Sequence, residues 1–244
     1  MMPSESRAVD TIDERAFAAS SGSRTRGEVA PPIDREQTAL TKIRYDRQAE
    51  SYEKRTSMME RLAFGKLRAR LWSLAGGPEV LEVGIGTGLN MPFYPRATDG
   101  TRITGIDLSD RMLEQARSRA ARDGIDVELL EMDAQDLRFP SDTFDSAVST
   151  CVFCSVPDPV LGLREVRRVL KPGGRLVMIE HVRPKGLLGL LFDVLNPLIV
   201  RLQGANVNRQ TVANVSRAGF EIESVESHHL GIVRLIVARK SGGD

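Results

Sequence analysis

Cysteine is scarce in this sequence: the 244-residue chain contains only two, Cys151 and Cys154. Two cysteines exclude a scaffold held together by disulfides. They are also too few for a structural zinc site built from four thiolates. Because no set of three metal ligands stands out elsewhere in the sequence, we expect no metal site.

A surplus of one charge is absent as well, because 34 Lys and Arg residues are balanced by 33 Asp and Glu residues, for a net charge of +1. This balance argues against a nucleic-acid-binding protein held by a bulk positive field. No apolar run reaches the ~20 residues of a membrane span, and the N-terminus has none of signal-peptide length. We therefore expect a cytoplasmic chain without a nucleic-acid partner, and leave open a contact with a membrane surface.

The chain divides into a polar beginning and a patterned remainder. Residues 1–38 are rich in Ser, Arg, Glu, Asp, Pro and Gly, and their few apolar residues follow no period, which predicts a disordered tail. Residues 39–244 are expected to form one domain of ordinary size. Over 38–75 leucines recur close to helical spacing and charges fill the other face, which predicts helix up to Gly76-Gly77-Pro78.

From Glu79 onward short apolar strands alternate with helices that have a polar face. Strands are expected at 79–83, 102–107, 127–132, 144–149 and 175–180, and helices at 110–123, 159–170 and 208–218. Ser109 is a plausible N-cap for the first of these helices. Two more strands, 221–227 and 232–239, are expected to close the chain as an antiparallel pair. The alternation predicts an α/β fold with a mostly parallel sheet and helices on both faces.

A glycine-rich turn, Gly84-Ile85-Gly86-Thr87-Gly88, follows directly after the first expected strand. Glycine is needed where a ligand lies against the backbone, because a Cβ would hold the ligand away. In a doubly wound sheet such a turn lies at the carboxyl end of the first strand, in the ligand-binding crevice. The dinucleotide pattern G-x-G-x-x-G is not completed here, since its third position is Leu89.

Two carboxylates narrow the choice of ligand. Glu82 lies two residues before the first glycine, where a negative charge is unfavourable beside a pyrophosphate but favourable beside a cation or an ammonium group. This favours S-adenosylmethionine, which carries a sulfonium and an α-amino group, over NAD. Asp107 ends the second expected strand, the place where doubly wound nucleotide sites hold the ribose hydroxyls.

Four blocks of this sequence, in this order, resemble class I S-adenosylmethionine-dependent methyltransferases. They are VLEVGIGTG, GIDLSDRMLEQARSRA, EMDAQDLRFPSDTFDSAVS and EVRRVLKPGGRLVMIEHVRP, and the resemblance covers about residues 41–240. It implies a Rossmann-like, seven-stranded sheet with an antiparallel last strand, S-adenosylmethionine as cofactor, and methyl transfer as the reaction. Since Cys151 and Cys154 fall after the fourth strand of such a fold, we interpret their C-x-x-C as two small apolar residues and not as a redox pair.

The resemblance also implies which residues contact the cofactor. The glycines would line its methionine and ribose, Glu82 would lie near the methionine amine, and Asp107 would accept the ribose hydroxyls. Leu108, Met112, Asp133 and Ala134 would surround the adenine, and the end of the fourth strand would lie below the transferred methyl group. The full expected set is Glu82, Gly84, Gly86, Gly88, Asn90, Asp107, Leu108, Met112, Asp133, Ala134, Ser149 and Thr150.

Two stretches that resemble narrower groups bear on the methyl acceptor. Tyr45-Asp46-x-x-Ala49-x-x-Tyr52 resembles the first helix of methyltransferases acting on quinones and phospholipids, which tends to fold over the cofactor pocket; tyrosines that pack on the sheet are the alternative. Residues 150–156, 180–182 and 90–95 resemble a group with bacterial phosphatidylethanolamine N-methyltransferase-like proteins and membrane-associated thiol S-methyltransferases.

A third stretch, residues 185–202, is an apolar insert between the fifth strand and the next helix. Eleven of the sixteen residues from Leu187 to Leu202 are strongly apolar, but Asp193, Asn196 and Pro197 interrupt them. The insert is too short and too broken to span a bilayer. It is interpreted as the cap of an apolar acceptor site or as a peripheral membrane contact, with burial in the core or in a dimer interface as the alternative.

His181 ends the fifth expected strand, near the expected active site. An imidazole can accept a proton from an amine or thiol near neutral pH; an orienting hydrogen bond is the alternative role. The leading hypothesis is methylation of a small hydrophobic or lipid acceptor at nitrogen or sulfur. A quinone-ring C-methyltransferase is the second hypothesis, and a catalytically silent, cofactor-binding protein of the membrane surface is the third.

Overall fold

The computed structural model describes residues 32–59, 64–95, 99–181, 209–229 and 232–242. Two of the predicted features, the tail up to residue 31 and the apolar insert 185–202, lie outside these residues. Within the described ranges, no helix is both long and apolar enough to cross a membrane.

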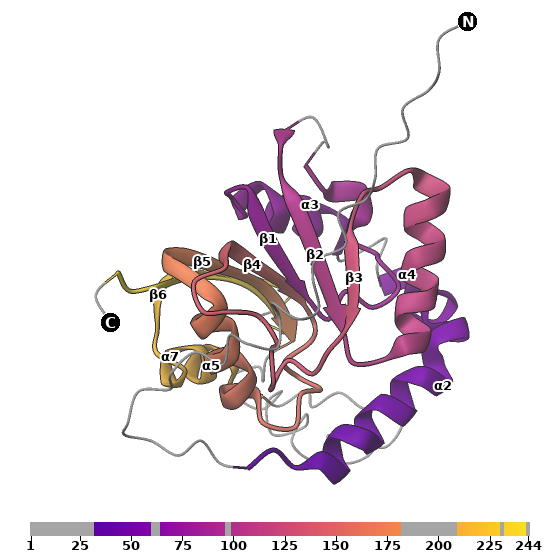
Figure 1. Cartoon of the computed structure of the whole chain (residues 1–244), viewed down its shortest axis with the longest axis horizontal. Coiled ribbons are helices and arrows are strands. Elements are labelled where there is room, and N and C mark those ends of the chain that lie inside the picture. Colours follow the sequence, from indigo (N-terminus) through magenta and orange to yellow (C-terminus); the bar gives the residue numbers. More distant parts are fainter. Residues whose placement is uncertain (1–31, 60–63, 96–98, 182–208, 230–231, 243–244) are drawn as a thin grey trace, which may run out of the picture.

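A seven-stranded sheet with the order β3-β2-β1-β4-β5-β7-β6 forms the centre of the molecule (Figure 1). Neighbouring strands from β3 to β5 are parallel, whereas β7 is antiparallel to both β5 and β6. This confirms the predicted Rossmann-like sheet with an antiparallel last strand. The strands are β1 (Glu79–Val83), β2 (Arg102–Asp107), β3 (Glu128–Glu131), β4 (Phe144–Thr150), β5 (Leu170–His181), β6 (Phe220–His228) and β7 (Val233–Lys240).

Helices cover both faces of the sheet, as predicted. Because side chains alternate along a strand, β1 contributes side chains to two apolar cores, one on each face of the sheet. Leu81 packs in the core that contains Leu163, and Val80 packs in the core that contains Leu71. Leu163 lies on α5 and Leu71 on α3, so these two helices pack on opposite faces. The helices are α2 (Arg35–Met59), α3 (Gly65–Leu74), α4 (Asp110–Asp123), α5 (Pro159–Val169) and α7 (Thr211–Arg217), with a short 3₁₀ turn, η2 (Met91–Phe93).

Two predicted elements differ from the structure. The segment predicted as helical over 38–75 contains α2 and α3, and residues 60–63 between them lie outside the described residues. In addition, α2 begins inside the predicted tail, since the Asp34 side chain accepts a hydrogen bond from the Gln37 backbone N–H at 3.0 Å and caps the helix. The fifth strand begins at Leu170 and not at residue 175, because Leu170 already pairs with Phe144 of β4. A register shift follows, and the pairing continues from Arg175.

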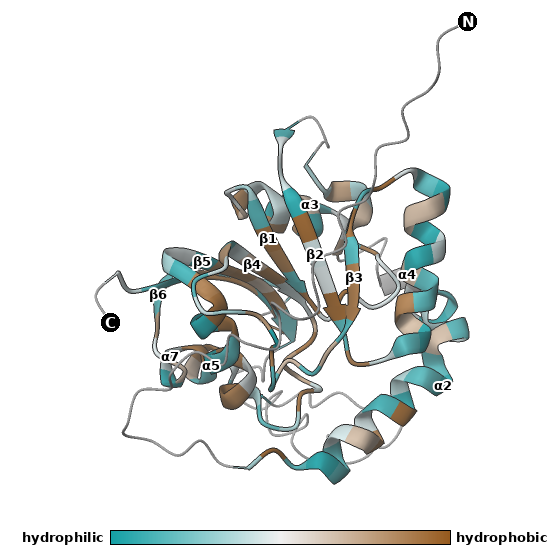
Figure 2. Ribbon diagram, in the orientation of Figure 1, coloured by the Kyte–Doolittle hydropathy of each residue, from teal (hydrophilic) through white to brown (hydrophobic). Residues whose placement is uncertain are grey.

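The parallel strands point their carboxyl ends toward the end of the molecule that α2 crosses (Figure 1). Figure 2 shows that α2 is mostly hydrophilic, with apolar residues at a few positions. The helix is therefore set across the edge of the sheet where doubly wound folds bind ligands, and polar contacts hold much of it there.

Candidate functional site

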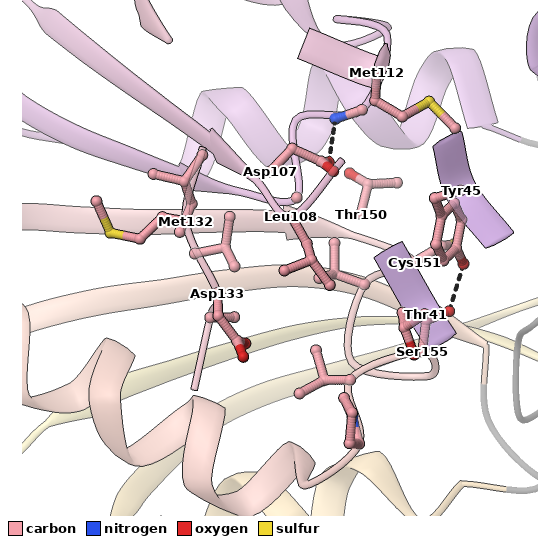
Figure 3. Close-up of a pocket in the computed structure, with 18 of the residues that line it drawn as sticks. Thr41, Tyr45, Asp107, Leu108, Met112, Met132, Asp133, Thr150, Cys151 and Ser155 are labelled. Atoms are coloured by element: carbon pink, nitrogen blue, oxygen red, sulfur yellow. Dashed lines mark hydrogen bonds between the residues drawn. The ribbon is translucent and has the colours of Figure 1, made fainter. Parts of the chain in front are cut away.

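A pocket of about 730 Å³ lies at the carboxyl ends of β1, β2 and β4. Its wall comes from the turns that follow these strands and from α2 (Figure 3). Most of the expected cofactor residues line it: Gly84, Gly86, Asp107, Leu108, Met112, Asp133, Ala134 and Thr150.

The glycine turn after β1 gives the pocket an open backbone wall. Gly84 and Gly86 have φ angles of +66° and +58°, which side chains rarely adopt. A Cβ on Gly84 would lie 2.4 Å from the Val152 side chain, whereas no atom lies within 4 Å of a Cβ on Gly86. A side chain at either position would thus fill space or displace the neighbouring loop, which fits a backbone that a cofactor approaches closely.

Asp107 lies at the end of β2 with its carboxylate in the pocket wall. It accepts hydrogen bonds from the backbone N–H groups of Gly86 and Ser109, both at 2.9 Å. Burial raises the pKa of Asp107 to about 6, against the opposing effect of these donors. Each carboxylate oxygen has a further lone pair, so the group can accept two ribose hydroxyls while it holds the glycine turn.

The helix α2 folds over this pocket, as the resemblance predicted, and contributes Thr41, Tyr45 and Tyr52 to its wall. The Tyr45 hydroxyl shares a hydrogen bond of 2.5 Å with the Ser155 hydroxyl (Figure 3). Burial raises the pKa of Tyr45, so its hydroxyl stays protonated. Further along the helix, Asp46 accepts a hydrogen bond of 2.6 Å from the Ser109 hydroxyl. The two contacts join α2 to both sides of the pocket.

Four expected cofactor residues lie behind the pocket wall and do not line it: Glu82, Gly88, Asn90 and Ser149. Glu82 is 1% exposed and accepts hydrogen bonds from the Asn90 amide, at 2.8 Å, and from the Tyr94 hydroxyl. Burial raises the pKa of Glu82 to about 7. Its negative charge would therefore reach a ligand through the wall, and no direct contact is available in this arrangement.

The loop after β4 forms the other side of the pocket. Cys151 lines the pocket at a φ of +56°, and its Sγ lies 3.3 Å from the Nδ1 of His181. His181 also packs edge-on against Phe64, with ring centroids 5.7 Å apart. Cys154 fits the predicted apolar role, because it is buried and burial raises its pKa to about 12. Cys151 packs against the apolar cluster of α3 in the same way, and it adds a contact with His181 behind the pocket wall.

Glu180 is a positioning residue that the sequence did not single out by role. Its side chain is fully buried, and its Oε1 accepts hydrogen bonds of 2.9 Å from the backbone N–H groups of Val152 and Phe153. Burial raises the pKa of Glu180 to about 7. Glu180 thereby fixes the loop that carries Cys151. Within the described residues, no group of three His, Cys, Asp or Glu side chains could hold a metal ion.

Comparison with known proteins assigns the chain to a family. Residues 81–178 match a family described as "Methyltransferase domain". A thiol S-methyltransferase of Rattus norvegicus is 31% identical over 184 residues, which cover 73% of each chain. The chain belongs to the S-adenosylmethionine-dependent methyltransferases. Proteins of this family and fold use S-adenosylmethionine as methyl donor, in agreement with the cofactor predicted from Glu82 and Asp107.

The names of other proteins similar to this methyltransferase refer to different methyl acceptors. A phosphatidylethanolamine N-methyltransferase of Cereibacter sphaeroides is 42% identical over 115 residues, which cover 46% of this chain and 55% of that protein. Among solved structures, a methyltransferase of Thermotoga maritima described as a possible histamine N-methyltransferase has a TM-score of 0.64 at 25% identity, over 81% of this chain and 98% of that one. The chain thus spans about half of the first of these relatives.

Proposed function

We propose that this methyltransferase moves the methyl group of S-adenosylmethionine to the nitrogen or sulfur of a small hydrophobic or lipid acceptor. The two unlike sides of the pocket carry this proposal. Figure 3 shows Asp107 and Asp133 toward one side and Tyr45, Cys151 and Ser155 toward the other. The second side continues into the apolar Val152 and Val156. The carboxylates of the first side match the polar ribose of the methyl donor, and the valines of the second side match an apolar acceptor.

On the donor side, the residues of the chain would bind and orient the cofactor. Gly84 and Gly86 let it approach the backbone, and Asp107 accepts its ribose hydroxyls. Leu108 and Met112 offer apolar surface to the adenine, and Asp133 and Ala134 face its edge. When bound, the cofactor supplies an electrophilic methyl group on a sulfonium. Because charge is neutralised in this transfer, alignment and exclusion of water are the main tasks left to the protein, and α2 covers the pocket.

On the acceptor side, the proton of the incoming amine or thiol needs an acceptor. We assign this role to His181, which does not itself line the pocket but lies behind Cys151, with its Nδ1 3.3 Å from the Cys151 Sγ. Glu180 holds the loop of Cys151 from behind. General-base catalysis of this kind contributes about 10²–10⁴-fold to a rate. The apolar insert 185–202 is proposed as the peripheral contact with the lipid phase, on the strength of its composition alone.

A second candidate is a quinone-ring C-methyltransferase. The names of two relatives support this candidate. A demethylmenaquinone methyltransferase of Clavibacter sepedonicus is 33% identical over 160 residues, which cover 60% of this chain and 64% of that protein. A chloroplastic hydroquinone methyltransferase of Oryza sativa is 40% identical over 116 residues, 48% of this chain and 34% of that protein. Tyr45 and Tyr52 would offer flat apolar surface to a ring.

The experiment that separates the candidates uses methyl-labelled S-adenosylmethionine. The full chain is incubated with phosphatidylethanolamine vesicles, an alkyl thiol and a reduced quinone, and the labelled products are separated by class. Label on the amine or the thiol supports the proposal, and label on the quinone carbon selects the second candidate. Cofactor binding with no label in any class contradicts both and favours a catalytically silent protein.

A further inference from the structure

A series of buried polar side chains leads from α3 to the wall of the cofactor pocket. The Arg68 side chain, 7% exposed, donates from Nη1 to the Oδ1 of Asn90 at 2.7 Å. The Nδ2 of Asn90 donates in turn to Glu82 at 2.8 Å and to the hydroxyl of Thr150 at 3.2 Å. Tyr94 donates to the second oxygen of Glu82. Because Thr150 lines the pocket, the series ends at the cofactor site.

The charges in this series are balanced around Glu82. The groups that face its carboxylate are Arg68 from α3, Asp107 from β2, and the side chains of Asn90 and Tyr94. Burial and Asp107 favour the protonated form, whereas Arg68 and the two hydrogen-bond donors favour the ionised form. Arg68 is the cation in this set, and together with the Tyr94 and Asn90 donors it favours the ionised form of Glu82.

The Arg68 guanidinium also lies over the Phe64 ring, 5.8 Å from its centroid, but this packing contact does not account for the hydrogen bond to Asn90. The helix already packs through Leu67, Leu71 and Trp72, and the preceding Phe64 adds to the same apolar cluster. A buried ion pair contributes no more stability than well-packed apolar side chains of the same volume. The guanidinium is placed where it orients Asn90, whose amide oxygen and nitrogen are both engaged by this series.

We infer that Arg68 is a positioning residue of the cofactor site: it fixes the Asn90 amide and supplies the positive charge that keeps Glu82 negative toward the ammonium end of S-adenosylmethionine. This inference rests on the proposed function in one respect, the placement of that ammonium group near Glu82. Arg68 lies outside residues 81–178, the part that matches the methyltransferase family. The donor site of this chain would therefore depend on a helix that precedes the shared block.

The test measures the dissociation constant of S-adenosylmethionine between pH 6 and 9 for the wild type, Arg68→Met and Arg68→Lys. Loss of the cation raises the pKa of Glu82. A rise of one unit above the wild-type value of about 7 should make Arg68→Met bind about fivefold more weakly at pH 7 and about ninefold more weakly at pH 6. Its affinity should approach the wild-type value already by pH 8, where Glu82 ionises again while an α-amino group, with a pKa of about 7.7–8.0, still carries part of its charge. Arg68→Lys keeps the charge and should lie close to the wild-type profile.

5′-Methylthioadenosine, which lacks the amino-acid part of the cofactor, is the control ligand and should bind all three proteins equally. If Arg68→Met does not fold, Arg68→Gln replaces it, since it keeps a donor for Asn90 without the charge. Identical pH profiles for wild type and the uncharged variant, or equal losses for both ligands, would overturn the inference. Failure of the wild type to bind S-adenosylmethionine would instead overturn the proposed function.

Discussion

Asp107 combines two tasks at one residue, because its carboxylate holds the glycine turn and faces the pocket. Replacement by Asn removes the charge and places an amide N–H₂ against one of the two backbone donors. Since a hydrogen bond to a charged group contributes about 1.5–3 kcal/mol, Asp107→Asn should weaken S-adenosylmethionine binding by about 10- to 100-fold. Calorimetry measures this, with the exposed Asp126→Asn as control. Unchanged affinity would refute the ribose assignment.

The contact between His181 and Cys151 leads to a prediction about the rate of methyl transfer and not about the affinity for the cofactor. If His181 accepts the acceptor's proton, His181→Asn should lower kcat by at least about 100-fold and leave the cofactor affinity within about twofold. Single-turnover kinetics with the acceptor identified by label provide the measurement. The matched control is His228→Asn, at a half-exposed position of β6. A loss in cofactor affinity that equals the loss in rate would leave His181 with a packing role only.

The residues of the donor site differ in how far the sequence could predict them. Gly84, Gly86 and Asp107 were predicted because their signal is local: a strand, a turn without side chains, and an acid at the next strand end. Arg68 was not, since the helical pattern assigns it to a charged outer face. Its burial depends on Asn90, whose position is fixed only when η2 folds against α3.

At the scale of elements, α2 is joined to the body by side-chain hydrogen bonds, and these should set how fast the pocket opens. Tyr45→Phe and Ser155→Ala each remove the same hydrogen bond, worth about 0.5–1.5 kcal/mol. Each should therefore speed cofactor dissociation by about 3- to 10-fold.

The double variant of these two residues should be no faster than Ser155→Ala alone, because the Tyr45–Ser155 bond is lost in all three variants and the further contact of the Ser155 hydroxyl with the Cys154 Sγ, at 3.7 Å, is lost in both variants that lack this hydroxyl. Stopped-flow dissociation of S-adenosylmethionine measures the rates. Thr56→Ala is the control, because the Thr56 hydroxyl bonds only within α2, to the Tyr52 carbonyl oxygen at 2.9 Å. Additive effects of Tyr45→Phe and Ser155→Ala would show that the pair does not fasten the helix.

The bounds of β1, β2 and α4 were predicted to the residue, because chemical signals mark their ends. Ser109 caps α4 by accepting a hydrogen bond from the Met112 backbone N–H, and Gly124 ends it at a φ of +64°. The bounds of α2 and α3 between Met59 and Gly65 have no such signal. Residues 59–64 contain no Gly, Pro, Ser, Thr, Asn or Asp, so the sequence has no helix stop or start signal there.

For the molecule as a whole, three buried carboxyl groups make its stability depend on pH. Burial raises the pKa of Glu82 and Glu180 to about 7 and of Asp107 to about 6, above the values expected in the unfolded chain. Their protonated forms favour the folded state, and this contribution is lost as the pH rises through the folded pKa values. The melting temperature of the cofactor-free protein should fall by about 5–10 °C from pH 6 to pH 8.

Differential scanning calorimetry at several pH values measures this fall. Glu180→Gln keeps an oxygen for the backbone donors and removes one titrating group, so its profile should be flatter than that of the wild type. Glu221→Gln, at an exposed position of β6, should keep the wild-type slope. A melting temperature that rises from pH 6 to pH 8 would contradict the assigned directions.

All residues that line the pocket precede the last three strands of the sheet in the sequence. The residues that line it come from positions 41–157, whereas β5 reaches the same edge of the sheet later and ends at His181. The loop after β4, residues 151–157, lies inside the segment 81–178 that matches the methyltransferase family, and α2 lies outside it. The two walls of one pocket thus come from the matched segment and from a helix that precedes it.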